Sequence, residues 1–367
     1  MPDAIGAIVD EAGGAVVIEP LQIDRPEAGE VLVRIVASGV CHSDLWARDN
    51  GNWGSPFPLL LGHEGAGIVE EVGAGVESLA PGDSVVLSWA VPCGMCRPCL
   101  RGIPRRCSHA WTQPPRIRRQ RDGALLSGVL ACGTLATHTV VHAEQAIPLP
   151  SGIPLESACL LGCGVSTGVG AAVQTAKVWP GASVAVIGLG GIGLAAMQGA
   201  KIAGAERLIA VDIAPNKLAW ARRFGATDVV DASATDPVEA VWSLTGGEGV
   251  DFAFEATGVP VCVRQAVEML SYAGTAVAIG VPPIPSEVTL PWNGSERAAY
   301  PRKTSLLVTD GGDPIPSEDF PQMAEWYVQG RLNLDEMVSR RLSLTDIDEA
   351  FRAMLAGEVI RSVVVFD

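Results

Sequence analysis

Residues 183–200 read SVAVIGLGGIGLAAMQGA, and this stretch decides the fold of the central part of the chain. Its first half is an apolar run suited to a strand buried on both faces, and its second half has apolar residues at helical spacing. A Gly-x-Gly-x-x-Gly motif lies where the strand ends and the helix begins. Such a motif lets a dinucleotide pyrophosphate approach backbone amides at a helix N-terminus. The predicted residues are Gly188, Gly190, Gly191 and Gly193.

The end of the next strand indicates which dinucleotide binds. Asp212 closes the apolar run RLIAVDI. A carboxylate at this place bonds the adenosine ribose diol and repels a 2′-phosphate, and the following DIAPNK offers no arginine to receive one. We therefore expect NAD rather than NADP.

On either side of this stretch, the character of the sequence changes. After residue 164, strand runs (VDFAFEAT, GTAVAIGVP) alternate with helical segments such as PNKLAWARRFGA, which predicts βαβ units and a parallel sheet. The first 150 residues are short β-rich pieces such as VLVRIVASGV and THTVVH, typical of a barrel-like domain. From about 303 the pattern is mixed, and it ends in the strand RSVVVFD. This order predicts a domain of residues 164–302 inserted between residues 1–163 and 303–367 of another.

Composition excludes several classes of protein. A chain of 367 residues exceeds one economical core, so we expect two domains. The net charge of -15 repels nucleic-acid phosphates and anionic membranes, which favours a small-molecule substrate. The N-terminus lacks a basic stretch before an apolar core, and no apolar run reaches about 18 residues. We expect a cytoplasmic protein.

Four cysteines crowd into PCGMCRPCLRGIPRRC, within a predicted lobe of residues 92–108. Four thiolates at this spacing can enclose one tetrahedral zinc ion and leave it no open position, so the site should be structural. An iron–sulfur cluster also takes four thiolates, but the bacterial run has its fourth cysteine closer and followed by proline. The predicted zinc ligands are Cys93, Cys96, Cys99 and Cys107.

A second set of metal-binding residue types is spread along the chain: Cys41 in GVCHSD, His63 and Glu64 in GHEGAG, and Cys163 in GCGVSTG. Two thiolates and one imidazole leave a fourth position open for water or substrate, as in a catalytic zinc site. Spacing alone cannot join these residues, because a lone cysteine is more often part of a core.

Two other features have plain structural interpretations. The arginine run PPRIRRQRDG (114–123) is predicted to be a solvated loop, with a role in holding an anionic substrate as the alternative. Cys132, Cys159 and Cys262 lie in apolar strings, so we expect core residues rather than a redox sensor.

In this order, the strings GVCHSD, GHEGAGIVEEVGAGV, GCGVSTG, VIGLGGIG and GEVIRSVVVF resemble the zinc-dependent medium-chain alcohol dehydrogenases over nearly the whole chain. The resemblance implies an α/β protein, with a GroES-like β-rich catalytic domain and a Rossmann doubly wound parallel-sheet domain that binds NAD. It also implies two zinc ions per chain, one catalytic and one structural. Zinc would lower the pKa of an alcohol hydroxyl, and hydride would pass to the nicotinamide.

The family pattern implies roles around the catalytic zinc. Cys41, His63 and Cys163 hold the metal, with Glu64 close behind it and Asp44 orienting His63.

The pattern also implies a proton path. Ser43 takes the first proton and passes it to the nicotinamide ribose. Trp46 stands where many members end the relay with a histidine, and its indole cannot accept a proton. The last step must then run through ribose and water, or through another base.

Further matched positions concern cofactor and pocket. His42 and Arg361 match pyrophosphate contacts, with a surface salt bridge as the alternative for Arg361. The other cofactor positions are Thr167, Ile192, Lys217 and Val281, and the pocket positions are Trp46, Trp89, Leu135 and Val281. Two indoles suggest a flat apolar pocket for aromatic, allylic or medium aliphatic primary alcohols.

Two alternatives stay open. The segment after Lys303 resembles members that oxidise an S-hydroxymethyl thiol, where the arginines at 116–121 would hold thiol carboxylates; the glutathione-dependent class has an arginine near the place of Trp111. A non-catalytic dinucleotide-binding scaffold is a different class, which predicts one zinc or none. The long insertion after Cys107 resembles that of the dimeric family members rather than the short-lobed tetrameric ones, so the resemblance implies a homodimer.

Overall fold

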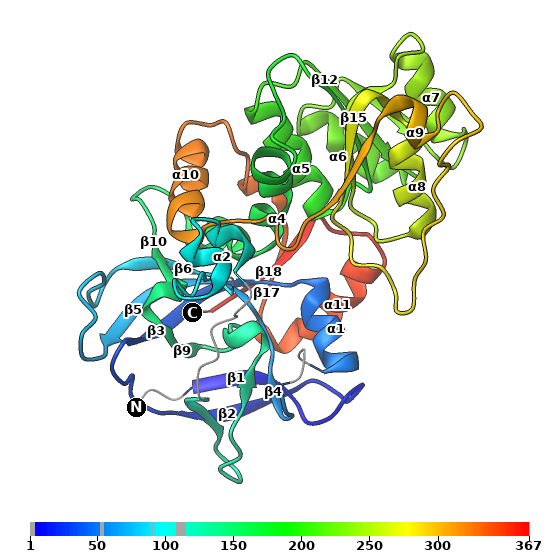
Figure 1. Cartoon of the computed structure of the whole chain (residues 1–367). Coiled ribbons are helices and arrows are strands. Elements are labelled where there is room, and N and C mark those ends of the chain that lie inside the picture. The colour runs from blue at the N-terminus through cyan, green and yellow to red at the C-terminus, as the bar shows by residue number, and fades with distance from the viewer. Residues whose placement is uncertain (1–3, 52–54, 90, 108–114, 367) are drawn as a thin grey trace. The chain divides into compact units, whose positions relative to one another are not determined.

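The computed structural model describes residues 4–51, 55–89, 91–107 and 115–366 (Figure 1). They form two compact units, the β-rich unit of residues 1–163 and 315–367 and the sheet-and-helix unit of residues 164–314. The sequence placed the second border at 302/303. It lies later because β16 (Ser305–Val308) pairs in parallel with β15 (Leu270–Ala278) and so belongs to the central sheet. Within the described residues, no single helix is long and apolar enough to cross a membrane.

The β-rich unit contains two mainly antiparallel sheets, in the orders β7-β2-β1-β4-β8 and β10-β6-β5-β3-β18-β17, with β9 also paired to β3. The strands are β1 (Ala4–Val9), β2 (Val17–Ile23), β3 (Glu30–Gly39), β4 (Leu59–Leu60), β5 (Glu64–Val72), β6 (Ser84–Leu87), β7 (Ile117–Arg119), β8 (Ser127–Gly128), β9 (His138–His142), β10 (Ala146–Pro148), β17 (Val338–Leu342) and β18 (Arg361–Val365). The helices are α1 (His42–Asn50), α2 (Arg97–Leu100), α3 (Leu155–Ala158), α10 (Pro316–Val328) and α11 (Ile347–Leu355).

β3 is the central strand of the larger sheet because its residues are apolar on both faces. It pairs with β5 along one edge and with β9 and β18 in turn along the other. Val31, Val33 and Ile35 are buried in one core cluster with residues of β6 and β9. The closing strand β18 thereby joins the two sequence-distant parts of this unit.

The sheet-and-helix unit has one parallel sheet in the order β13-β12-β11-β14-β15-β16. Its other strands are β11 (Ser183–Ile187), β12 (Arg207–Asp212), β13 (Asp228–Asp231) and β14 (Val250–Glu255), and its helices are α4 (Gly164–Gly170), α5 (Gly191–Ile202), α6 (Pro215–Arg223), α7 (Pro237–Leu244), α8 (Pro260–Glu268) and α9 (Ala299–Arg302). The predicted α/β class, with a doubly wound sheet, is confirmed. The order reverses between β11 and β14, and ligands bind doubly wound sheets at that point, outside the carboxyl ends of the strands.

Candidate metal and dinucleotide sites

The first metal-ligand set is built on the start of α1. Cys41 precedes the helix in extended conformation, and the carboxylate of Asp44 accepts its backbone amide at 3.3 Å. The same carboxylate accepts the amide of Gly62 at 2.9 Å and lies 3.0 Å from Nδ1 of His63. Asp44 is fully buried. One side chain thus ties the segment of Cys41 to the segment of His63.

Cys41, His63, Glu64 and Cys163 bring ligand atoms to within 4.8 Å of one another, and all four are buried. Because Asp44 engages Nδ1 of His63, Nε2 is the nitrogen left for a metal. Nε2 is buried and has no hydrogen-bond partner among the described residues. A buried polar atom of this kind needs a partner, and two sulfurs with one imidazole are a donor set that zinc prefers. The residues therefore fit a zinc ion.

Behind this cluster, Glu64 and Arg361 form a buried ion pair. Burial raises the pKa of Glu64 to about 7, although Arg361 acts to lower it. Burial acts to lower the pKa of Arg361, but the charges of Glu64 and Cys41 outweigh it and raise that pKa. The pair escaped sequence reasoning because its members are 297 residues apart. Arg361 is buried and not at the surface, so the alternative of a surface salt bridge is wrong.

The two thiols of the cluster are linked to each other. Their mutual hydrogen bond is the main cause that lowers the pKa of Cys41 and raises the pKa of Cys163. A divalent cation would displace the remaining proton, because metals bind thiolates.

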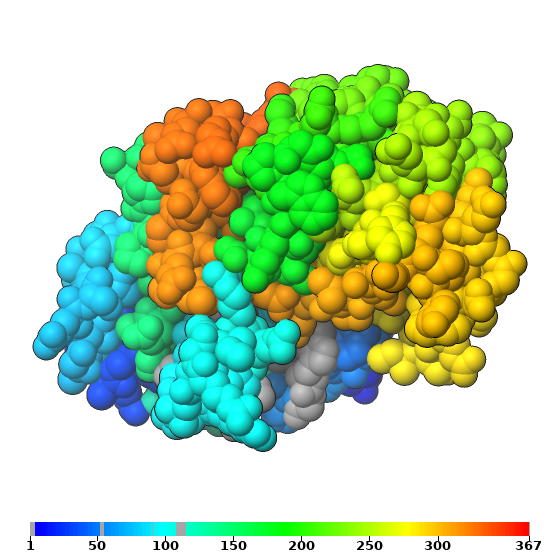
Figure 2. Space-filling model, turned by 45° about the horizontal axis from the view of Figure 1, so that its top comes forward, coloured from blue at the N-terminus to red at the C-terminus, as the bar shows by residue number. Residues whose placement is uncertain are grey.

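The four-cysteine lobe also brings its Sγ atoms to within 4.8 Å of one another. The amides of Cys93 and Cys96 donate to the sulfurs of Cys107 and Cys93, each at 3.3 Å. Arg105 holds the lobe to α10 through two bonds to Asp319, of 2.5 and 3.3 Å. Figure 2 shows the lobe in cyan at the surface and α10 in orange. Ser108, the predicted end of the lobe, and Trp111 lie outside the described residues.

The arginine run forms β7 and a following turn. Each of its four arginines pairs with carboxylates of the β-rich unit: Arg116 with Glu27 and Glu30, Arg118 with Asp24, and Arg119 and Arg121 with Asp10, Glu19 and Asp122. The side chain of Arg119 is only 8% exposed. The chain's own carboxylates thus pair with the run. It forms a short strand and an exposed turn instead of a solvated loop throughout, and it gives no support to a role in holding a substrate carboxylate.

The glycine motif lies between β11 and α5, at the carboxyl edge of the sheet. Gly188 has φ +89°, which favours glycine, and a Cβ on Gly193 would collide with the carbonyl oxygen of Gly188. A Cβ on Gly190 would meet nothing within 4 Å. The loop therefore needs two of its glycines for its own packing, whereas Gly190 faces open space of the kind that a pyrophosphate would fill.

Asp212 ends β12 at the same carboxyl edge of the sheet, and it is buried. It accepts the amide of Leu189 at 2.7 Å and that of Ala214 at 3.0 Å, and Nζ of Lys217 lies 3.9 Å away. The carboxylate thus braces the glycine loop, as well as standing where the sequence places the ribose contact.

The remaining predicted residues differ in how far they are buried. Leu135 is fully buried in a core cluster of the β-rich unit, so it presents no surface to a ligand and its assignment to the pocket needs correction. Val281 is 78% exposed. Thr167 is buried in α4 and His42 is exposed. Ser43, Trp46, Trp89 and Ile192 are half-buried. Cys132 and Cys159 are core residues as predicted, and burial raises the pKa of both.

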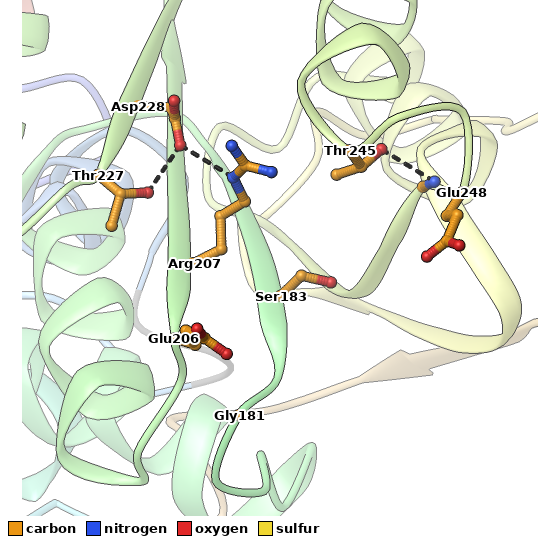
Figure 3. Close-up of a pocket in the computed structure, with 9 residues that line it drawn as sticks. Gly181, Ser183, Glu206, Arg207, Thr227, Asp228, Thr245 and Glu248 are labelled. Atoms are coloured by element: carbon orange, nitrogen blue, oxygen red, sulfur yellow. Dashed lines mark hydrogen bonds and ion pairs between the residues drawn. The ribbon is translucent and has the colours of Figure 1, made fainter.

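A cavity of about 550 Å³ lies at the opposite, amino edge of the parallel sheet (Figure 3). Arg207 on its wall bonds Asp228 at 3.1 Å and the carbonyl of Leu244 at 2.5 Å, and the hydroxyl of Ser183 bonds Asp251. These polar groups satisfy one another. Because doubly wound folds bind ligands at the other edge, this cavity carries no functional assignment.

Comparison with known proteins covers both units. Residues 27–151 match the family described as "Alcohol dehydrogenase GroES-like domain", and residues 191–329 match "Zinc-binding dehydrogenase". "Alcohol dehydrogenase class-3" of Cereibacter sphaeroides is 36% identical, over 98% of this chain and 99% of that protein. "S-(hydroxymethyl)glutathione dehydrogenase" of Paracoccus denitrificans is 34% identical, over 98% and 99%.

Two solved dehydrogenase structures match the full length of this chain. The crystal structure of benzyl alcohol dehydrogenase from Acinetobacter calcoaceticus matches with a TM-score of 0.91 and 31% identity, covering all of both chains. A zinc-binding dehydrogenase from Sinorhizobium meliloti, bound to NADP, matches with a TM-score of 0.83 and 27% identity over the full length of both.

Proposed function

Because the chain belongs to the zinc-dependent medium-chain dehydrogenase family, we propose that it transfers hydride reversibly between a primary alcohol and NAD to give the aldehyde. The alcohols that we propose are aromatic, allylic or medium aliphatic. The observation that carries the proposal is the buried cluster of two thiols and one imidazole, whose Nε2 has no partner among the described residues. A scaffold that only bound a dinucleotide would have no use for such an open metal site.

The residues of the cluster have distinct proposed roles. Cys41, His63 and Cys163 hold the catalytic zinc, which when bound acts as a Lewis acid on the alcohol hydroxyl. Asp44 fixes the imidazole of His63 so that Nε2 is directed to the metal. Ser43, which follows the ligand Cys41 by two residues, passes the alcohol proton outward. The four cysteines of the lobe hold a second zinc ion that stabilises the lobe.

The protein uses a nicotinamide dinucleotide, and we propose that it is NAD. The buried carboxylate of Asp212 would repel a 2′-phosphate, and Lys217 is the cation described beside it, at 3.9 Å. We propose further contacts from His42, Thr167, Ile192, Val281 and Arg361. Parallel assays with NADP test this choice, because one structural neighbour binds NADP.

Oxidation of an S-hydroxymethyl thiol is the second candidate, and the name of the relative from Paracoccus denitrificans favours it. The arginine run speaks against carboxylate binding by these arginines, because all four are paired within the unit. A thiol adduct would need another anchor.

We also propose that the protein is a homodimer. β16 lies at the edge of the parallel sheet, and all four of its residues are exposed, including Leu306, Leu307 and Val308. An exposed apolar edge strand can pair with a second chain. Light scattering coupled to size-exclusion chromatography should give twice the chain mass, and a chain mass at micromolar concentration would contradict this proposal.

The test of function is initial-rate NADH formation by zinc-quantified protein with benzyl, allyl and aliphatic alcohols, and with formaldehyde plus glutathione. We expect turnover of a free alcohol with NAD. Activity only with formaldehyde and glutathione together would move the assignment to the second candidate. No turnover, with one zinc or none per chain, would favour the scaffold.

A further inference from the structure

A strained turn lies in the β-rich unit, between β8 and β9. Leu130 and Ala131 adopt left-handed backbone conformation, with φ of 51° and 58°, and Gly133 follows at 64°. Residues with a Cβ rarely take this conformation, and two in succession persist only where the surroundings hold them. Such strain gathers at functional sites.

The side chain of Gln145 holds the turn through its amide group. It is fully buried, and its Nε2 donates to the carbonyl of Ala131 at 3.3 Å and to the carbonyl of Ser88 at 3.2 Å. Its Oε1 accepts the amide of His142 at 3.2 Å, which fixes the orientation of the amide group. The amide of Ser88 in turn donates to the backbone oxygen of Gln145 at 2.8 Å. One residue therefore links the strained turn to the end of β6.

The strained turn leads directly to the segment that carries His63. The amides of Thr134 and Leu135 donate to the carbonyls of Gly62 and Leu61, at 3.0 and 2.9 Å. Gly62, at φ +96°, approaches this strip so closely that any Cβ would collide with it. A shift of the turn would therefore move the backbone next to His63.

The end of β6 lies against the segment that carries Cys163. A Cβ on Gly162 would come within 2.8 Å of the carbonyl oxygen of Leu87, the residue before Ser88. Trp89 follows Ser88 and is half-buried. Gln145 thus joins two strips, each packed against a residue that precedes a proposed zinc ligand.

We propose that Gln145 is a positioning residue that sets which alcohols the site accepts. It holds the turn 129–133 and the strip Ser88–Trp89 at a fixed separation beside the metal cluster. The inference rests on the proposed function, and it adds a residue in contact with neither metal nor substrate to the determinants of specificity.

The test compares wild type with Gln145→Met, which keeps the side-chain volume and removes the hydrogen bonds. We expect the ratio of kcat/KM for benzyl alcohol to that for ethanol to move toward one by about tenfold, the scale of single pocket contacts. Zinc per chain and the Kd for NADH should stay within about twofold. Hydrogen exchange should speed up in peptides that cover 84–89 and 128–135.

A rescue separates positioning from general destabilisation. Glycine takes left-handed conformation without strain, so Ala131→Gly in the Gln145→Met background should return the ratio and the exchange rates toward wild type. Ser157→Ala is the control, because Ser157 is another buried side chain of the same unit and loses a hydrogen bond, to Asp335 at 2.7 Å. It should leave the ratio unchanged.

If Gln145→Met does not fold, Thr139→Val takes its place in the same assay. It removes a further hydrogen bond to the turn, from the Thr139 hydroxyl to the carbonyl of Cys132 at 2.5 Å, and should move the ratio in the same direction. Faster exchange with an unchanged ratio would overturn the inference, as would an absence of rescue. If wild type oxidises no alcohol, the proposed function fails, and the exchange data still decide whether Gln145 holds the turn.

Discussion

Asp44 makes three interactions from a fully buried position, to the amides of Cys41 and Gly62 and to the ring of His63. An amide in place of this carboxylate would set an NH2 group against at least one of these donors. We expect Asp44→Asn to weaken zinc binding by about 10- to 100-fold, the usual cost of losing a partner of a ligand histidine. Competition with a chromophoric chelator measures the affinity.

Asp49→Asn is the control for this variant. Asp49 lies on the same helix but is exposed and bonds only its neighbour Arg48 among the described residues. Equal zinc affinity in Asp44→Asn and Asp49→Asn would show that Asp44 does not support the metal site.

Substitution of Ser43 tests the proposed proton path. If its hydroxyl is the sole exit for the alcohol proton, Ser43→Ala should lower kcat by about a hundredfold or more, with zinc content unchanged. Ser43→Thr keeps a hydroxyl and should restore most of the rate. Little change in Ser43→Ala would mean that water carries the proton instead.

At the level of residues, the family resemblance named the ligands and the contact of Asp44 with His63, but not the ion pair of Glu64 with Arg361. Cys41, His63 and Cys163 were joined by family resemblance, because nothing in their spacing predicts that they meet. The pair of Glu64 with Arg361 depends on β5 and β18 flanking β3, which is a property of the sheet order. Sequence distance hides such a contact.

Substitutions in the glycine loop between β11 and α5 test whether this loop binds the dinucleotide. Gly190 has φ -77° and open space around its Cβ position, so Gly190→Ala should keep the thermal midpoint and weaken NADH binding. Gly193→Ala should lower the thermal midpoint itself, because its Cβ would meet the carbonyl oxygen of Gly188. Calorimetry with NADH fluorescence titration measures both effects. Equal NADH affinity in Gly190→Ala and wild type would argue against pyrophosphate binding at this loop.

Strand prediction succeeded where burial leaves a pattern. β11, β12 and β14 are buried, and their runs of apolar residues made them predictable from the sequence. β16 was missed because it is only four residues long and its sequence, SLLV, shows no alternation of polar and apolar residues. β1 was missed because Gly6 interrupts it, and that glycine is needed where Leu60 and Leu21 approach to less than 3 Å of its Cβ position.

At the level of the whole molecule, carboxylates that pair with arginine make the folded state less stable in acid. Hydrogen bonds from Arg352 and then Arg340 lower the pKa of Glu349 to about 2. Since the pKa is about 4.5 in the unfolded chain, this stabilisation is complete above that pH and is lost as the pH falls toward 2. The urea midpoint should therefore fall less steeply below about pH 5 in Glu349→Gln than in wild type. Equal slopes would contradict the assignment, and Glu318→Gln, an exposed change on α10, is the control.

The proposed function depends on a second zinc site at Cys41, His63 and Cys163, apart from the four-cysteine lobe. The most direct measurement is zinc per chain by mass spectrometry of elements, in folded wild type and Cys163→Ser. We expect about two zinc ions per chain in wild type and about one in the variant. One zinc or none in wild type, or two in both proteins, would contradict this expectation.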